Sequence, residues 1–124
     1  MIAEQTLTTA EVAAKFNEFS KAGNFEGIQN ELFAENAVSV EPPNQMGMQS
    51  VEGLAAIKEK GRVFNEMVEE MHGGYSSEPV VAGNYFSVAM GMDVTLKGSG
   101  RLKMDEIALY EVKDGKIVKE QFFY

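Results

Sequence analysis

The sequence predicts an α+β fold in which helices from the first half of the chain cover a curved antiparallel sheet from the second half. Two observations indicate this class. Apolar residues recur at intervals of three and four up to about Met71, and they alternate with a period of two after Gly73-Gly74. Tight turns then separate the strands, as in antiparallel sheets. The length of 124 residues suits one domain, residues 1–124.

Local signals predict two helices at the start of the chain. A capping box over residues 8–11 begins the first helix, because a Thr hydroxyl can cap it while Glu11 reaches back. Gly23 is a plausible left-handed residue at its end. A second, short helix is predicted from the apolar residues Phe25, Ile28, Leu32 and Phe33.

A short strand and a long third helix are predicted next. The strand covers residues 37–41, because Pro42 and Pro43 stop both helix and central strand pairing. Ser50 is the expected N-cap of the third helix. The apolar stripe of this helix consists of Leu54, Ile57, Gly61, Phe64, Val68 and Met71.

The second half is predicted to be strands joined by turns. Gly83-Asn84 predicts a two-residue hairpin between a strand over residues 75–82 and a long alternating strand over residues 86–96. Further turns are expected at residues 98–100 and 113–115.

The last hairpin is expected to close with a three-residue loop that pairs Val112 with Lys116 and Ala108 with Glu120. One face would then carry Met104, Glu106, Ala108, Tyr110, Val118, Glu120, Phe122 and Tyr124. The other would carry Ile107, Leu109, Ile117, Gln121 and Phe123. A two-residue loop would exchange these sets. Because both faces are half apolar, one should face the helices and the other a second subunit, which predicts a homodimer.

The composition argues against several classes of partner and site. The net charge of −8 argues against nucleic acid and membrane surfaces as partners. The chain has no cysteine and one histidine, His72, which excludes disulfides and multi-histidine metal sites. No apolar run approaches the ~18 residues of a membrane span, and the first residues lack signal-peptide features. We expect a cytoplasmic protein without a metal or an organic cofactor.

The order of elements resembles the nuclear transport factor 2-like fold, and within it the SnoaL-like and ketosteroid-isomerase-like superfamily. The resemblance covers nearly the whole chain, and it is carried by residues 22–28, 32–38, 41–42, 51–53 and 113–117. It implies a cone-shaped fold with three helices over the sheet, an apolar pocket between them, and usually a homodimer. The fold hosts isomerases, cyclases, dehydratases and binding proteins, so the resemblance implies no single activity.

Residue by residue, the resemblance implies a mixed site. Glu41, directly before Pro42, matches the acidic general base of the isomerases. Phe16 and Ala108 stand where the isomerases carry a tyrosine and a protonated aspartate, so steroid isomerase activity is not expected. Glu120 lies in the region where polyketide cyclases carry an acid/base residue.

The candidate catalytic residues are therefore Glu41, Glu106 and Glu120. An apolar pocket disfavours an ionised carboxylate, which raises its pKa toward values useful for proton transfer. In the expected register Glu106 and Glu120 are diagonal neighbours that could share a proton. The alternatives are a solvated strand end for Glu41, and a wet rim or a dimer interface for the pair.

The ligand pocket is expected to be lined by Phe16, Phe19, Phe64, Met90, Met92, Ala108, Phe122 and Tyr124. The expected ligand is a small apolar molecule that carries a carbonyl. The predicted function is a small-molecule-binding domain acting as a cofactor-independent isomerase, cyclase or dehydratase. The alternative is a non-catalytic ligand-binding or dimeric scaffold domain. For His72, a hydrogen-bonding role is expected more than a catalytic one.

Overall fold

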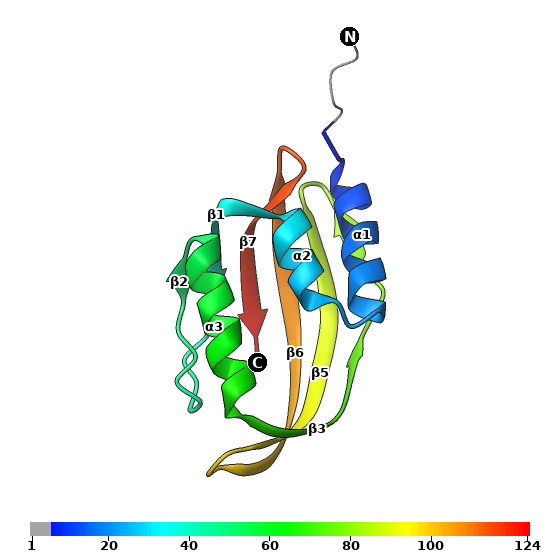
Figure 1. Ribbon diagram of the computed structural model, residues 1–124. Helices are drawn as coiled ribbons and strands as arrows, with labels where there is room; N and C mark the ends of the chain where they lie inside the picture. Colours follow the sequence, from blue (N-terminus) through cyan, green and yellow to red (C-terminus); the bar gives the residue numbers. More distant parts are fainter. Residues whose placement is uncertain (1–5) are drawn as a thin grey trace.

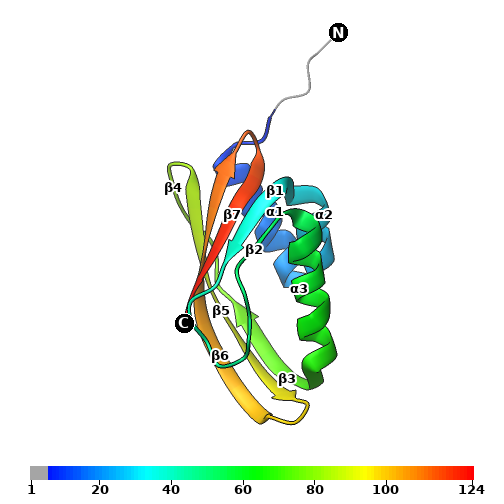
Figure 2. The same cartoon turned by 90° about the vertical axis from the view of Figure 1, so that its left-hand side faces the viewer.

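The computed structural model describes residues 6–124 and shows an α+β fold (Figure 1). All strands belong to one curved sheet, and the three helices lie on its concave side (Figure 2). The predicted fold class is confirmed. The elements are α1 (Thr9–Lys21), α2 (Phe25–Leu32), β1 (Phe33–Val40), β2 (Val51–Glu52), α3 (Leu54–Met67), β3 (Val68–Ser76), β4 (Val80–Ala82), β5 (Tyr85–Leu96), β6 (Gly100–Lys113) and β7 (Lys116–Phe123).

The sheet is mixed, whereas the sequence predicted a purely antiparallel one. The strand order is β2-β1-β7-β6-β5-β3, and β4 pairs with β5. Strands β1 and β7 run parallel, with Ser39 opposite Glu120. A parallel pair needs a long connection, and here the whole of the chain between β1 and β7 supplies it. This pairing brings the two ends of the fold together at the site described below.

The start of α1 follows the prediction. The Thr8 hydroxyl accepts a hydrogen bond from the Glu11 amide at 3.1 Å, and the Glu11 carboxylate accepts one from the Thr8 amide at 2.9 Å. This reciprocal pair is the predicted capping box. Gly23 follows the helix with a φ of +70°, the left-handed conformation expected there.

Two predicted helix boundaries are wrong. Phe33 begins β1 instead of ending α2, and α3 ends at Met67, so Val68 and Met71 belong to β3. Both segments have an apolar pattern that a helix or a strand could satisfy. Strand pairing decides between them, because Val68 lies opposite Leu96 of β5 and Phe33 lies opposite Ile117 of β7.

The predicted start of α3 is also wrong. Gly53, with a φ of +91°, occupies the N-cap position. The Ser50 hydroxyl instead accepts a hydrogen bond from the Glu41 amide at 2.9 Å. Ser50 therefore closes the loop between β1 and β2 and leaves the helix end uncapped by a side chain.

The strand expected over residues 75–82 is two strands. Strand β3 ends at Ser76 and β4 begins at Val80, with Pro79 between them. Proline has no amide hydrogen to donate, so it interrupts the ladder. The predicted two-residue turn at Gly83-Asn84 is confirmed, because Ala82 pairs with Tyr85.

The last hairpin closes with two turn residues instead of three. Asp114 and Gly115 have φ values of +51° and +76°, and Lys113 pairs with Lys116. Both turn residues are left-handed, as a tight hairpin turn requires. The expected pairing of Val112 with Lys116 is therefore wrong, and Val112 lies opposite Ile117.

A bulge in β7 then restores most of the expected face assignment. Glu111 pairs with Lys119, so Val118 has no partner of its own on β6. Beyond the bulge, Tyr110 lies opposite Glu120 and Ala108 opposite Phe122. The inner face carries Glu106, Ala108, Tyr110, Glu120 and Phe122 as expected. Ile117 is a correction, because it is fully buried in the core and does not lie on the outer face.

The core lies between the three helices and the inner faces of β1, β5, β6 and β7. Phe16, Phe86 and Tyr110 form its centre, with ring centroids separated by 4.7–5.3 Å. All three side chains are buried. We refer to these residues as the aromatic core.

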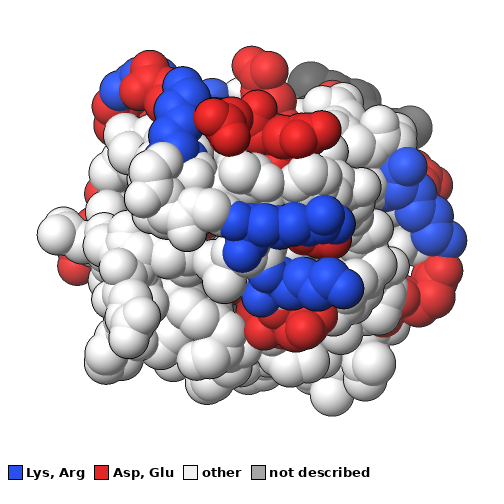
Figure 3. Space-filling view, turned by 90° about the horizontal axis from the view of Figure 1, so that it is seen from below, with Lys and Arg blue, Asp and Glu red and all other residues white. Residues whose placement is uncertain are grey.

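The surface of the described residues carries charges of both signs. Arg62 pairs with Glu59 and Glu66 on α3, and Arg101 pairs with Asp93 across β5 and β6. On the face shown in Figure 3, basic side chains lie beside acidic ones. None of the helices in residues 6–124 is both long and apolar enough to cross a bilayer.

Candidate functional site

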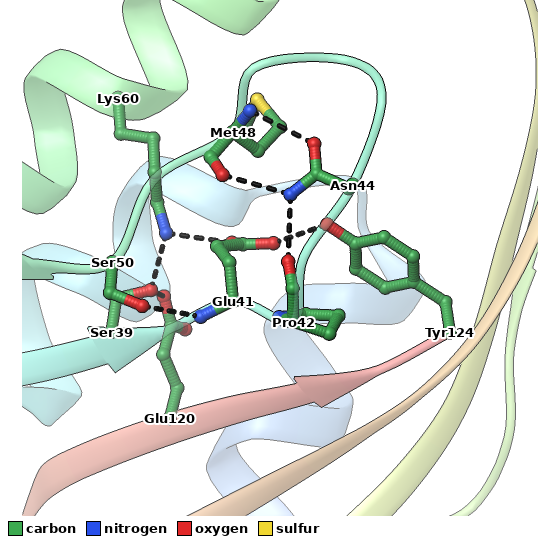
Figure 4. Close-up of polar contacts among 9 residues, drawn as sticks. All are labelled: Ser39, Glu41, Pro42, Asn44, Met48, Ser50, Lys60, Glu120 and Tyr124. Atoms are coloured by element: carbon green, nitrogen blue, oxygen red, sulfur yellow. Dashed lines mark hydrogen bonds and ion pairs between the residues drawn. The ribbon is translucent and has the colours of Figure 1, made fainter.

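A connected set of polar side chains lies where β1, β7 and α3 meet (Figure 4). The Ser39 hydroxyl donates to the Glu120 carboxyl at 2.8 Å. The Lys60 ammonium donates to the Ser39 hydroxyl at 2.6 Å and to the Glu41 carboxylate at 2.7 Å. The Tyr124 hydroxyl donates to the other oxygen of Glu41 at 2.7 Å. We refer to these five residues as the Lys60 network.

The secondary structure explains how distant residues meet. In β1, side chains alternate between faces, so Ser39 shares the inner face with the fully buried Ala37. Glu120 is the parallel partner of Ser39 on β7 and points to the same face. On α3, Lys60 lies one turn after the buried Ile57, so it faces the sheet as well.

Glu41 is an anchored residue in this structure. Each of its carboxylate oxygens accepts a hydrogen bond, one from Lys60 and one from Tyr124. The side chains of Lys60 and Glu41 are only 12% and 6% exposed, so this is a largely buried ion pair. Both carboxylate oxygens therefore act as acceptors within the Lys60 network.

The loop after Glu41 is connected by hydrogen bonds of Asn44. The Asn44 side-chain amide donates to the carbonyls of Pro42 and Met48 at 2.9 and 2.8 Å, and its oxygen accepts from the amides of Met46 and Met48. This loop walls a cleft of about 360 Å³ whose other side is formed by Tyr124 and residues 102–105.

A larger groove lies elsewhere. It measures about 590 Å³ and lies between residues 6–10 and the turns at Gly83-Asn84 and Asp114-Gly115. It contains none of the candidate carboxylates. Groove volume therefore does not identify the candidate site. The candidate site is identified by the charged and titratable side chains of the Lys60 network.

Glu120 is 7% exposed. Burial raises its pKa to about 7, while the Ser39 hydrogen bond and the Lys60 charge act in the opposite direction and the Glu41 charge adds to the rise. At neutral pH this carboxyl is thus divided between its protonated and ionised forms, which is the property required of a group that takes up and returns a proton.

Glu106 titrates in the same range for related reasons. Burial raises its pKa to about 7, and the charges of Glu41 and Glu120 add to the rise, while Lys60 lowers it. The expected diagonal pairing with Glu120 is wrong. The cross-strand pair of Ala108 and Phe122 lies between the two acids. Glu106 and Glu120 therefore interact through their charges.

The apolar residues expected in the pocket fall into two groups. Phe16 and Ala108 are fully buried core residues, and Phe19 packs partly buried against the core. Half-buried residues lie on the inner side of the site: Phe64, Met90, Met92 and Phe122. The Lys60 ammonium lies 5.6 Å from the centre of the Phe122 ring. Tyr124 is 43% exposed and lines the cleft beside the loop.

The sequence comparisons identify the family. A model of the SnoaL-like domain matches residues 7–124. The chain belongs to the SnoaL-like family. The resemblance found in the sequence is thereby confirmed. No curated protein matches this SnoaL-like chain.

Solved structures agree with this assignment. A Mesorhizobium loti protein, provisionally named a SnoaL-like polyketide cyclase, is 37% identical, with a TM-score of 0.88 over 95% of this chain and 100% of that one. A nuclear transport factor 2-like protein of unknown function from Burkholderia pseudomallei is 14% identical, with a TM-score of 0.74 over 94% and 89%. TerC, co-crystallised with polyporic acid, is 20% identical, with a TM-score of 0.72 over 94% and 90%. The last two show the fold alone.

Sequence reasoning missed two members of the Lys60 network in this SnoaL-like protein. Lys60 stands three residues after Ile57 and four before Phe64, so it is a charge within an apolar helical stripe. Ser39 shares the inner face of β1 with Ala37, and Glu41 follows two positions later, directly after the strand. The charge of Lys60 within an apolar stripe could have indicated that residue. The spacing of two positions between Ser39 and Glu41 could have indicated Ser39.

His72 lies outside the site. It is in β3, where its Nε2 atom hydrogen-bonds to the Thr95 hydroxyl at 2.7 Å. Within residues 6–124, no group of three His, Cys, Asp or Glu side chains is arranged to hold a metal ion.

Proposed function

We propose that this SnoaL-like protein is a cofactor-independent isomerase, cyclase or dehydratase in which Glu120 moves protons on an apolar carbonyl compound. The observation that carries the proposal is a buried carboxyl that titrates near pH 7 beside an apolar surface. Such a group can remove a proton next to a carbonyl and return it elsewhere.

The other charged residues take supporting roles in this proposal. Glu41, fixed by Lys60 and Tyr124, keeps the ammonium in place. Lys60 uses two of its three hydrogens within the network, and the third can donate to a ligand oxygen that gains negative charge. Glu106 is the second proton-transfer group, on the far side of Phe122.

The neighbouring side chains support an apolar substrate. Met90, Met92 and Phe122 are half-buried on the inner face, and thioether and aromatic surfaces accept ring compounds of varied shape. The name of the Mesorhizobium relative agrees with a polyketide-like substrate. We propose a small ring compound with an acidic C–H next to a carbonyl.

Exchange of carbon-bound hydrogen tests this proposal without knowledge of the natural substrate. The probe is 2-tetralone in D2O, and ¹H NMR follows loss of its α-proton signals. We expect the protein to accelerate the exchange, and Glu120→Gln to slow it by about 10²–10⁴-fold. Glu35→Gln, an exposed acid on β1, is the control.

Two results would contradict the enzymatic proposal. One is an exchange rate equal to that of buffer, and the other is an exchange that Glu120→Gln leaves unchanged. Saturable binding of 2-tetralone without exchange would favour the alternative, a non-catalytic ligand-binding domain. In that case Glu120→Gln would change the affinity alone.

We further propose that the protein is a homodimer that pairs through the outer sheet face. Ile107 and Phe123 are cross-strand partners there and are 46% and 47% exposed. Large apolar side chains at the centre of an open sheet face favour burial against a partner. Light scattering at micromolar concentration should give twice the chain mass, and Ile107→Lys should halve it. A monomer mass for the unmodified protein would refute the proposal.

A further inference from the structure

Ser39 occupies a position with no exposure to solvent at the centre of the Lys60 network. It lies opposite Glu120 in the parallel β1–β7 pair, and side chains at paired positions point to the same face. Its hydroxyl contacts two charged groups, the Glu120 carboxyl at 2.8 Å and the Lys60 ammonium at 2.6 Å. It is therefore the only direct link between these two groups in the described part of the chain.

The direction of the hydrogen bonds constrains Glu120. Lys60 donates to Ser39, so the hydroxyl hydrogen is free to point at Oε1 of Glu120. Oε1 thus accepts and cannot carry the proton of the neutral acid. Every fully buried side-chain oxygen or nitrogen of the described residues has a hydrogen-bond partner. Oε2 has none there, so it keeps contact with the accessible surface.

We propose that Ser39 is a positioning residue that fixes the Glu120 carboxyl through Oε1, so that the transferable proton lies on Oε2 and faces the ligand. This inference rests on the proposed function for its catalytic consequence, because it assumes that Glu120 transfers the proton. The hydrogen bond from Lys60 polarises the Ser39 hydroxyl and strengthens its bond to Glu120.

Several charged or titratable groups face Glu120 besides Ser39. They are Glu41 directly after β1, Lys60 on α3, and Glu106 and Tyr110 on β6. Removing the Ser39 hydroxyl leaves all of them in place. It removes a hydrogen bond that favours the ionised carboxyl, so the pKa of Glu120 should rise further.

The experiment is a titration of the Glu120 carboxyl by ¹³C NMR in protein labelled at glutamate, with Glu120→Gln to assign the signal. In Ser39→Ala we expect the midpoint to move upward by roughly one pH unit. Ser20→Ala is the matched control, because it also removes a buried serine hydroxyl, one that bonds to Ser76 at 3.1 Å far from Glu120. It should leave the midpoint unchanged.

Ser39→Thr keeps the hydroxyl and should return the midpoint toward that of the unmodified protein. In the exchange assay, the acidic limb of the pH–rate profile should follow the midpoint upward in Ser39→Ala. An unchanged midpoint in Ser39→Ala, or an equal shift in Ser20→Ala, would overturn the inference. An exchange rate insensitive to Glu120→Gln would instead remove the proposed function and leave the titration result standing.

Discussion

The inner face of the sheet carries two neighbouring regions with opposite chemistry. The aromatic core lies under α1, where Phe16 closes over Phe86 and Tyr110. The Lys60 network lies beside α3, where charged and polar side chains replace the aromatic rings. The two regions meet at one cross-strand pair, Tyr110 opposite Glu120.

This contact shows how a packed core can change the pKa of an acid beside it. The aromatic core makes no hydrogen bond to Glu120, but it excludes water from one side of the carboxyl. The cost of ionising a carboxyl in that environment raises its pKa. The same packing that stabilises the fold therefore also sets the pH range of the acid next to it.

The largest loss of stability is expected for a substitution in the aromatic core. Phe86→Ala removes a ring that is 1% exposed and should destabilise the protein by about 3–5 kcal/mol. Phe122→Ala, in the half-buried region, should cost clearly less. Urea unfolding measures both. Equal losses would show that the two regions are packed to the same degree.

The second largest loss of stability is expected when the ion pair of the Lys60 network is removed. Lys60→Met leaves Glu41 without its cation and should cost about 3 kcal/mol, the lower end of the range for a broken buried pair. The double variant Lys60→Met/Glu41→Gln should recover part of the loss. Urea unfolding at pH 8 is the measurement, and a double variant as unstable as Lys60→Met would contradict the role given to the ion pair.

The pH dependence of stability tests how strongly the Glu120 carboxyl is buried beside the aromatic core. The pKa of Glu120 is about 7 in the folded protein and 4.5 for the free side chain, so the folded state binds more protons between these values. The free energy of unfolding should therefore fall as pH rises from about 4.5 to about 7, by up to about 3 kcal/mol at 1.36 kcal/mol per unit.

Glu120→Gln should flatten this part of the profile, because the amide does not titrate. Glu106 titrates in the same interval and should leave a smaller slope. Asp93, whose pKa the Arg101 hydrogen bond lowers, acts only at lower pH. A profile that Glu120→Gln leaves equally steep would contradict the burial of this carboxyl.

The smallest effect is expected on the half-buried surface. Met92→Leu nearly conserves volume and should change stability by less than about 1.5 kcal/mol. If this surface contacts the ligand, the affinity for 2-tetralone should change more than the stability does. Thermal unfolding and binding titrations give the two numbers, and an unchanged affinity would place the ligand elsewhere.

Local sequence signals predicted the parts of the fold that local interactions determine. The Thr8 and Glu11 capping box, and the Gly83-Asn84 turn, are each complete within four residues. The boundary between α3 and β3 depends instead on pairing with β5, because Val68 and Met71 fit a helical stripe as well. The bulge at Val118 has no local signal, since neither glycine nor proline marks it.

The same division explains the candidate site. Glu41 and Glu120 were found because carboxylates on apolar strands are conspicuous, and the family resemblance supports both positions. The connection between them was not predictable, because it depends on the parallel pairing of β1 with β7. Ser39 can be assigned to the network only when Glu120 is known to lie opposite it. Lys60 can be assigned only when α3 is known to face Ser39 and Glu41.

The parallel pairing of β1 and β7 has a further consequence during synthesis. Ser39 and Glu120 are separated by 81 positions, so β7 leaves the ribosome long after β1. Strand β1 therefore has only the short β2 as a neighbour while residues 53–115 are made. Contacts of such long range form late and slowly. The nascent protein thus holds Ser39 and Glu120 apart until β7 has been made, and a chain that stops before β7 cannot carry the assembled Lys60 network.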